Sequence, residues 1–336
     1  MPRLSRWRAW SLMAMILSLS CCAYAQTKEQ EHPHDGTPVL WVDPGDIGSR
    51  DLFWGVAGRN GQPKPPLTFV SEDLHGTNPK FDVRDADGTK WRAKLGPEAR
   101  PEVVASRLLW AVGYSANENY FYPMLHVDEM PAHLRRGQKL AGMNGDVPNL
   151  RLQRRYEGLK KVGTWDWRKN PFYGTREFNG LRVMMALIRN WDLYAGNNSI
   201  LRDKKSNREI YEVSDVGSAF GDTRRDYKER NSVGDLKAYG RGKLIARITP
   251  GLLDLDFPRL PPLGIIVDVP LYREELRARW IGRDIPRGDA KWIGSLLAQL
   301  KPHQVRDAFR AAGYEPSVVD SFTAIVLSRI QELNNL

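Results

Sequence analysis

The sequence predicts an α+β protein whose first half is rich in strands and whose second half is mainly helical. Polar and apolar residues alternate on both sides of the turn Asp-Ala-Asp-Gly at residues 85–88, over residues 80–84 and 91–95, which is typical of a β-hairpin. Later in the chain, apolar residues recur every three or four positions over 178–188 and 318–330. This period is typical of helices that bury one face.

The two halves are separated by residues 163–171, which combine glycine, proline and tryptophan with a change in composition. We therefore expect a β-rich lobe at residues 39–167 and a mainly helical lobe at residues 168–336. The chain is long enough for one two-lobed domain or for two small domains.

In the first half, further strands are expected at residues 69–70, 119–127 and 149–156. One helix is expected before residue 119. Pro101 opens it, because the fixed φ of proline suits the first helical turn, and Gly113 ends it.

In the second half, Thr175 can cap the first helix, which leads to a polar segment that begins at Asn190. A short hairpin is expected over residues 200–213, around a charged turn. A helix at residues 304–312 follows near the end of the chain, and Ser317 is expected to cap the last helix.

The first 25 residues are typical of an export signal. A basic start precedes an apolar run at residues 9–20 and the sequence Ala-Tyr-Ala at residues 23–25. We expect cleavage after Ala25 and a secreted or periplasmic protein. An uncleaved anchor and lipid attachment at Cys21 or Cys22 are alternatives. After removal of the signal, no apolar run is long enough to cross a membrane.

Composition restricts the kinds of site that the remaining chain can form. Both cysteines lie in the signal, so the mature chain has neither a disulfide nor a thiolate metal site. Residues 26–38 are polar and are expected to form a flexible tail, where His32 and His34 make at most a weak metal site.

The chain is basic, which favours anionic partners. Its formal net charge is +10, and removal of the three signal arginines leaves +7. Nucleotides, phospholipid headgroups and acidic polymers are therefore candidate partners. No specific nucleic-acid site is expected, because the basic residues are interleaved with acidic ones.

Three residues in the middle of the chain suggest chemistry. Asp192 and Asn197 follow the helix at 178–188, and Asp215 follows the hairpin, just before Val216 and Gly217. Phosphoryl transfer uses one aspartate to orient the attacking hydroxyl, and an asparagine and a second aspartate to hold magnesium. The D-x-x-x-x-N spacing recurs elsewhere in the chain, and Asp192 and Asn197 taken singly are also consistent with turn caps. The order of the elements makes the combination informative.

This order resembles that of the protein-kinase-like superfamily, in its atypical branches such as the phosphoinositide kinases, HipA-type kinases and secreted or spore-coat kinases. The resemblance covers about residues 65–220. It implies a two-lobed fold with ATP and Mg²⁺ or Mn²⁺ between the lobes. Asp192 matches the residue that positions the acceptor hydroxyl, Asn197 the ligand of the second metal ion, and Asp215 the aspartate of the metal motif.

The resemblance also assigns residues in the β-rich half. Lys94, in Arg-Ala-Lys-Leu, resembles the lysine that holds the α- and β-phosphates. Glu102 on the next helix resembles its ion-pair partner, with Glu98 in reserve because it precedes Pro101. Residues 76–83 would cover the phosphates and would include Gly76 and Lys80.

Three departures from the family pattern weaken this interpretation. The phosphate-covering segment has one glycine where protein kinases have three, so fewer of its amides can approach a phosphate. The catalytic loop has Asn-Trp-Asp instead of His-Arg-Asp, which fits atypical kinases better than conventional ones. Tyr194 stands where protein kinases commonly carry a lysine, so either another cation such as Lys80 substitutes or phosphoryl transfer is weakened.

The sequence therefore predicts an exported atypical kinase that transfers phosphate from ATP to a hydroxyl of an unidentified protein, lipid or glycan. Two alternatives remain open: a catalytically weak pseudokinase or nucleotide-binding module, and a structural protein of the cell envelope. The presence of Asp192, Asn197 and Asp215 together is an argument against a pseudokinase.

Overall fold

A computed structural model of the chain describes residues 36–76, 78–142, 144–223, 232–258, 276 and 278–336. The predicted export signal, Cys21 and Cys22, the tail up to residue 35 and Thr77 lie outside the described residues. Within the described part of the chain, no helix is both long enough and apolar enough to span a membrane.

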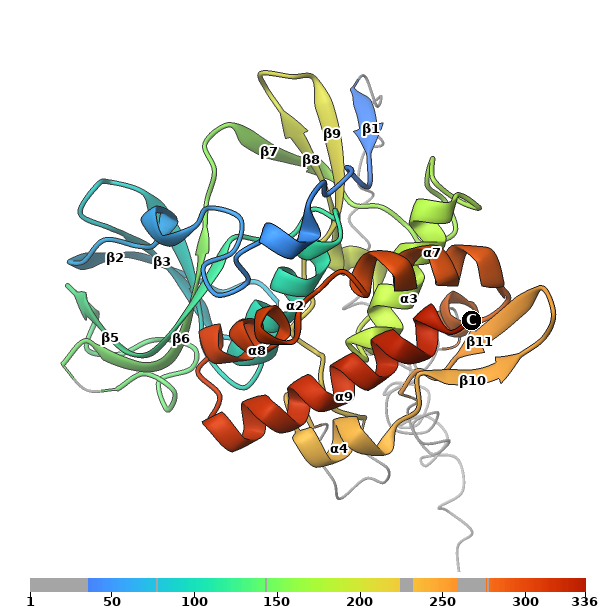
Figure 1. Cartoon of the computed structure of the whole chain (residues 1–336). Helices are drawn as coiled ribbons and strands as arrows, with labels where there is room; N and C mark the ends of the chain where they lie inside the picture. The colour runs from blue at the N-terminus through green and yellow to red at the C-terminus, as the bar shows by residue number, and fades with distance from the viewer. Residues whose placement is uncertain (1–35, 77, 143, 224–231, 259–275, 277) are drawn as a thin grey trace, which may run out of the picture. The chain divides into compact units, whose positions relative to one another are not determined.

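Five strands of the first half form a closed barrel (Figure 1). In sequence they are β2 (Leu67–Asp73), β3 (Lys80–Arg84), β4 (Lys90–Lys94), β5 (Asn119–Asp128) and β6 (Asp146–Arg154). Their order in the barrel is β2-β3-β4-β6-β5, and a parallel pairing of β2 with β5 closes it. The sequence had led us to expect a twisted antiparallel sheet, and the parallel pairing of β2 with β5 departs from it.

Apolar side chains at every second position of the barrel strands fill the interior of the barrel. In β4, Trp91 and Ala93 point into the apolar core of the barrel, so Arg92 and Lys94 must point to its outer face. The two faces of β3 differ in the same way, with Phe81 and Val83 inside. Lys80 and Lys94, which are cross-strand partners, therefore lie on the same outer face.

Helix α2 (Ala99–Ala111) follows β4 and packs against β5, β6 and α8 (Pro302–Ala311). The helix begins two residues earlier than expected, and Pro101 is its third residue. Proline is tolerated there because the first N–H groups of a helix have no partner within it. Glu98 is consequently the residue that precedes the first helical turn.

A second sheet has the order β1-β9-β8-β7. Its strands are β1 (Thr37–Val39), β7 (Leu159–Gly163), β8 (Asn198–Asp203) and β9 (Arg208–Val213). The hairpin of β8 and β9 was expected. Thr37 and Pro38, expected in the flexible tail, are instead part of β1, which pairs with β9.

The rest of the second half is mainly helical. Its α-helices are α3 (Arg176–Leu187), α4 (Leu236–Arg241), α7 (Arg287–Leu297), α8 and α9 (Pro316–Asn334). A small sheet combines β10 (Ile245–Ile248), β11 (Leu252–Leu255) and β12 (Ile285–Pro286). The described residues also form the short 3₁₀ helices η1 (Ile47–Ser49), η2 (Arg59–Gly61), η3 (Ala195–Asn197) and η4 (Arg279–Gly282).

Capping residues in the sequence correctly predicted the start of α3 but not that of α9. The Thr175 hydroxyl accepts a hydrogen bond from the Phe178 amide and caps α3, as predicted. Ser317 does not cap α9, because the helix begins at Pro316 and the residue before it is Glu315. The α+β class, with a strand-rich first part and a helical second part, is confirmed.

The end of α2 generates a stability prediction. Gly113 has a φ of +96°, and a Cβ at this position would lie 2.2 Å from the Val42 carbonyl oxygen. Gly88 has a φ of +81° but no heavy atom within 4 Å of such a Cβ. Gly88→Ala should therefore lose only about 1 kcal/mol of unfolding free energy from the left-handed backbone. Gly113→Ala should lose at least about twice as much, measured by urea unfolding. Equal losses would contradict the close packing at Gly113.

Candidate active site

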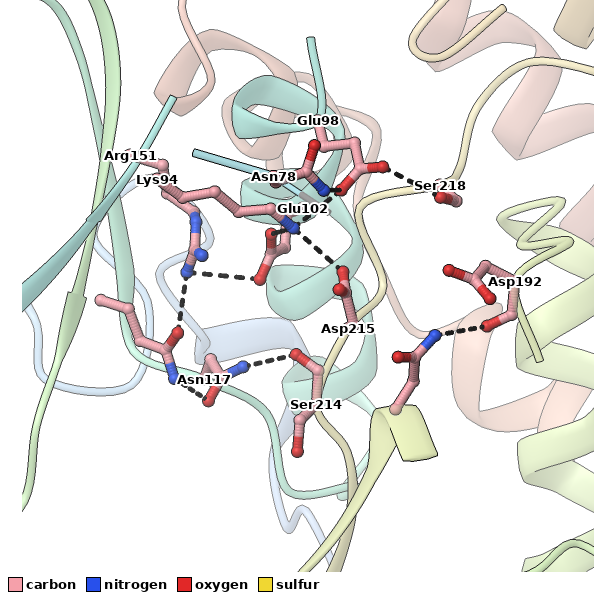
Figure 2. Close-up of polar contacts among 12 residues, drawn as sticks. Asn78, Lys94, Glu98, Glu102, Asn117, Arg151, Asp192, Ser214, Asp215 and Ser218 are labelled. Atoms are coloured by element: carbon pink, nitrogen blue, oxygen red, sulfur yellow. Dashed lines mark hydrogen bonds and ion pairs between the residues drawn. The ribbon is translucent and has the colours of Figure 1, made fainter. Parts of the chain in front are cut away.

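The ammonium of Lys94 lies among three carboxylates (Figure 2). Its Nζ atom is 2.7 Å from Glu98 Oε2, 3.0 Å from Glu102 Oε2 and 3.1 Å from Asp215 Oδ1. Lys94 comes from β4, the two glutamates from the start of α2, and Asp215 from the segment after β9. Residues far apart in the sequence thus converge at one point.

The spacing of the two glutamates explains why both reach the lysine. Glu98 and Glu102 are four residues apart at the start of α2, and residues with this spacing share one face of a helix. We had expected Glu102 alone to pair with Lys94, and had placed Glu98 outside the helix on account of Pro101. The structure brings both carboxylates to Lys94.

In this cluster, the carboxylates stabilise the charged form of Lys94, and Lys94 stabilises the charged form of Asp215. Burial alone would lower the pKa of Lys94, but Glu102, Asp215 and Glu98 outweigh this effect and raise it above its ordinary value. Burial would raise the pKa of Asp215, and the ammonium of Lys94 reverses this and lowers it. Lys94 is therefore an ammonium and Asp215 a carboxylate at neutral pH.

A row of three cations crosses the outer face of the barrel beside this cluster. Lys94 on β4 is the cross-strand partner of Lys80 on β3 and of Arg151 on β6. Arg151 is buried, and its Nη1 atom lies 3.3 Å from Glu102 Oε1 and 2.8 Å from Asn119 Oδ1. Like charges side by side in a sheet are destabilising unless anions lie next to them. Sequence reasoning missed Arg151, because only the strand register reveals this row.

Lys80 and Gly76 lie together at the β2–β3 connection. Lys80 Nζ is 3.9 Å from Asp73 Oδ2, and a Cβ added to Gly76 would be 3.3 Å from the same nitrogen. Burial lowers the pKa of Lys80. Tyr194, which stands where protein kinases commonly carry a lysine, is exposed to solvent.

The loop after α3 is anchored by a buried arginine. Arg189 has a φ of +53°, and its guanidinium lies 3.1 Å from Asp256 Oδ2 and 3.4 Å from Asp222 Oδ1. A residue other than glycine adopts this backbone region only when its surroundings hold it there. Arg189 thereby fixes the direction in which the chain continues to Asp192.

Asp192, Asn197 and Asp215 are joined through the backbone. The Asn197 side chain donates to the Asp192 carbonyl oxygen at 3.4 Å. The Asn197 carbonyl oxygen in turn accepts from the amides of Ser214 at 2.9 Å and Asp215 at 3.4 Å. Asp192 and Asn197 are thus neighbours of Asp215. Figure 2 shows Asp192 and Asp215 in the same region of the protein.

These residues suit a divalent cation. Burial, followed by the negative charge of Asp215, raises the pKa of Asp192 to about 6, and a bound cation would relieve this repulsion. Carboxylate and amide oxygens are the ligands that Mg²⁺ prefers, usually one or two carboxylates completed by phosphates. In the described ranges, no group of three or more His, Cys, Asp or Glu side chains is arranged to hold a metal ion.

Comparisons with known proteins find only distant likenesses. No model of a protein family matches the chain, and no curated protein matches it. Among solved structures, it is similar to the crystal structure of the Helicobacter pylori proinflammatory kinase CtkA. The identity is 11% and the TM-score 0.44, with 80% of this chain and 95% of that chain covered. It is also similar to the golgi casein kinase, at 12% identity and a TM-score of 0.32, with 80% and 74% covered.

At these TM-scores, the assignment of the fold rests on the chain's own geometry. A strand-rich lobe carries a lysine paired with a helix glutamate, and a mainly helical lobe carries Asp192, Asn197 and Asp215 in that order. This is the arrangement of protein-kinase-like proteins. The chain therefore has an α+β fold that carries the residue pattern of protein-kinase-like proteins.

The pKa of Asp192 predicts how stability depends on pH. Because folding raises this pKa from 3.8 to about 6, the folded state binds the proton more tightly, and stability falls as pH rises from about 4 to about 6. Asp192→Asn should therefore stabilise the metal-free protein at pH 8 by at most roughly 3 kcal/mol, and far less at pH 4. Urea unfolding in the presence of a chelator measures this difference.

The matched control is Glu157→Gln, which removes an exposed carboxylate. It should change stability little at either pH. A gain for Asp192→Asn that is the same at pH 4 and pH 8 would show that Asp192 has an ordinary pKa in the folded protein.

Proposed function

We propose that the protein is a kinase that transfers a phosphoryl group from ATP to a hydroxyl of a protein, lipid or glycan. The observation that carries the proposal is the 3.1 Å contact between Lys94 Nζ and Asp215 Oδ1, which joins residues 121 positions apart in the sequence. It brings the predicted phosphate-binding lysine to the predicted metal-binding aspartate, with Asp192 nearby.

The row formed by Lys80, Lys94 and Arg151 supplies positive charge for the phosphates. Lys94 lies at its centre and would hold phosphate oxygens, because an ammonium donates up to three hydrogen bonds. Arg151 is buried and paired with Glu102, so it keeps that glutamate in place. In this row, Lys94 would therefore bind the nucleotide, and Arg151 would hold the ion-pair partner of Lys94 in place.

Asp215 and Asn197 would hold Mg²⁺ or Mn²⁺. When bound there, the cation shields phosphate charge and orients the γ-phosphate. Asp192 would accept the hydrogen bond of the acceptor hydroxyl and take its proton. A pKa near 6 suits this role, since a general base is most effective when its pKa is close to the working pH.

Export of the chain remains part of the proposal, on the strength of the signal-like first 25 residues. In that case the acceptor is an exported or envelope molecule. The basic character of the chain favours an acceptor or surface that carries negative charge.

A second candidate is a nucleotide-binding module with little or no transfer. It is favoured by Tyr194, which stands in place of a lysine, and by the three carboxylates around Lys94, which compete with phosphate. The two candidates differ in whether Asp192 affects anything beyond binding.

The proposal predicts loss of phosphoryl transfer in two isosteric variants. The purified full chain, incubated with ATP and Mg²⁺ or Mn²⁺, should acquire phosphate or hydrolyse ATP, as measured by mass spectrometry and phosphate release. Asp192→Asn should reduce the rate about 100-fold or more, because it removes the base, and should leave nucleotide binding largely intact. Asp215→Asn should reduce both the rate and metal-dependent binding.

Glu157→Gln, which changes an exposed carboxylate, serves as the control and should keep the wild-type rate. Nucleotide binding without transfer, in wild type and Asp192→Asn alike, would favour the binding module. No binding of nucleotide at millimolar concentration in a thermal-shift measurement would rule out both candidates.

A further inference from the structure

Glu98 joins three separate parts of the site (Figure 2). Its Oε2 atom lies 2.7 Å from Lys94 Nζ and accepts a hydrogen bond of 2.7 Å from the side chain of Asn78, in the β2–β3 connection. Its Oε1 atom accepts a hydrogen bond of 3.2 Å from the hydroxyl of Ser218, three residues after Asp215. One carboxylate thus connects the barrel, the predicted phosphate-covering segment and the metal-motif segment.

The metal-motif segment packs directly against Glu98. A Cβ added to Gly217 would lie 2.8 Å from Glu98 Cβ and 3.1 Å from Glu98 Oε2. The Glu98 side chain is nevertheless 15% exposed, whereas that of Glu102 is 2% exposed. Glu98 is therefore held in place but is still in contact with solvent.

The N–H groups of Lys94 are already occupied by carboxylates, so a phosphate that binds there must displace one of them. An ammonium has three N–H donors, and three carboxylates lie within 3.1 Å of Lys94 Nζ. A phosphate oxygen can reach this nitrogen only if one carboxylate gives way or shares its donor.

Glu98 is the carboxylate best placed to give way. Glu102 is buried and also bridges to Arg151, so its departure would leave buried charges without a partner. Asp215 is the expected metal ligand. Among the residues that the structure describes, the hydrogen-bond partners of Glu98 besides Lys94 are the neutral Asn78 and Ser218. Glu98 can therefore turn toward solvent without leaving any other described charge unpaired.

We propose that Glu98 is a positioning residue that competes with the nucleotide phosphates for Lys94 and so weakens nucleotide binding. This inference rests on the proposed kinase function. When a phosphate takes the place of Glu98 at Lys94, the hydrogen bonds of Glu98 to Asn78 and Ser218 change as well. Binding at Lys94 is thereby coupled to the segments that flank the phosphates on both sides.

The test compares two isosteric variants with opposite expected effects. Glu98→Gln removes the competing charge, so the dissociation constant of a non-hydrolysable ATP analogue with Mg²⁺ should fall about tenfold in isothermal titration calorimetry. Glu102→Gln removes the supporting charge, so the same constant should rise about tenfold. A residue with a merely structural role would not tighten binding when it is changed.

Two further probes locate the effect at the phosphates. Inorganic tripolyphosphate with Mg²⁺ should bind Glu98→Gln more tightly than wild type, whereas binding of adenosine should be the same in both. The gain for tripolyphosphate should shrink as salt is raised, because the competing interaction is electrostatic.

Ser218→Ala is a second variant that keeps the test valid if Glu98→Gln folds poorly, as judged by circular dichroism. It removes one hydrogen bond that holds Glu98, so it should also tighten nucleotide binding, by less than Glu98→Gln. If wild type binds the analogue and neither variant binds it more tightly, the inference is wrong while the proposed function stands. If wild type and both variants fail to bind it, both are wrong.

Discussion

The site depends on one ammonium that is largely removed from water. Lys94 is 6% exposed, and a buried charge of this kind is stable only when opposite charges surround it. Glu98, just before α2, and Glu102, in its first turn, supply two of these charges, and Asp215 supplies one from the segment after β9. The need to neutralise Lys94 therefore holds the strand-rich lobe, its helix and the metal-motif segment in one arrangement.

The row of Lys80, Lys94 and Arg151 likewise depends on nearby carboxylates. Lys80, Lys94 and Arg151 are cross-strand neighbours on the outer face of the barrel, a placement that by itself is destabilising. The chain offsets it with carboxylates, of which Glu102 is the most buried. Phosphate oxygens are anionic like these carboxylates, so under the proposed function a nucleotide would compete with the carboxylates for the cations of the row.

Local patterns in the sequence predicted the local structure well. Strand β3 and the cap of α3 at Thr175 are where the pattern indicated, because alternation and capping depend on neighbouring residues. Features that depend on distant pairing were missed: the β2–β5 contact that closes the barrel, and the register that places Arg151 beside Lys94. The contribution of Glu98 was underestimated because Pro101 was taken as the first residue of α2, which begins at Ala99.

The account is tested most directly by a crystal structure of the protein with Mn²⁺ and a non-hydrolysable ATP analogue. It predicts an anomalous manganese signal beside the oxygens of Asp215 and Asn197. It also predicts that phosphate oxygens lie on Lys94, in place of the Glu98 carboxylate. Nucleotide and metal bound elsewhere, with the cluster of three carboxylates around Lys94 unchanged, would contradict it.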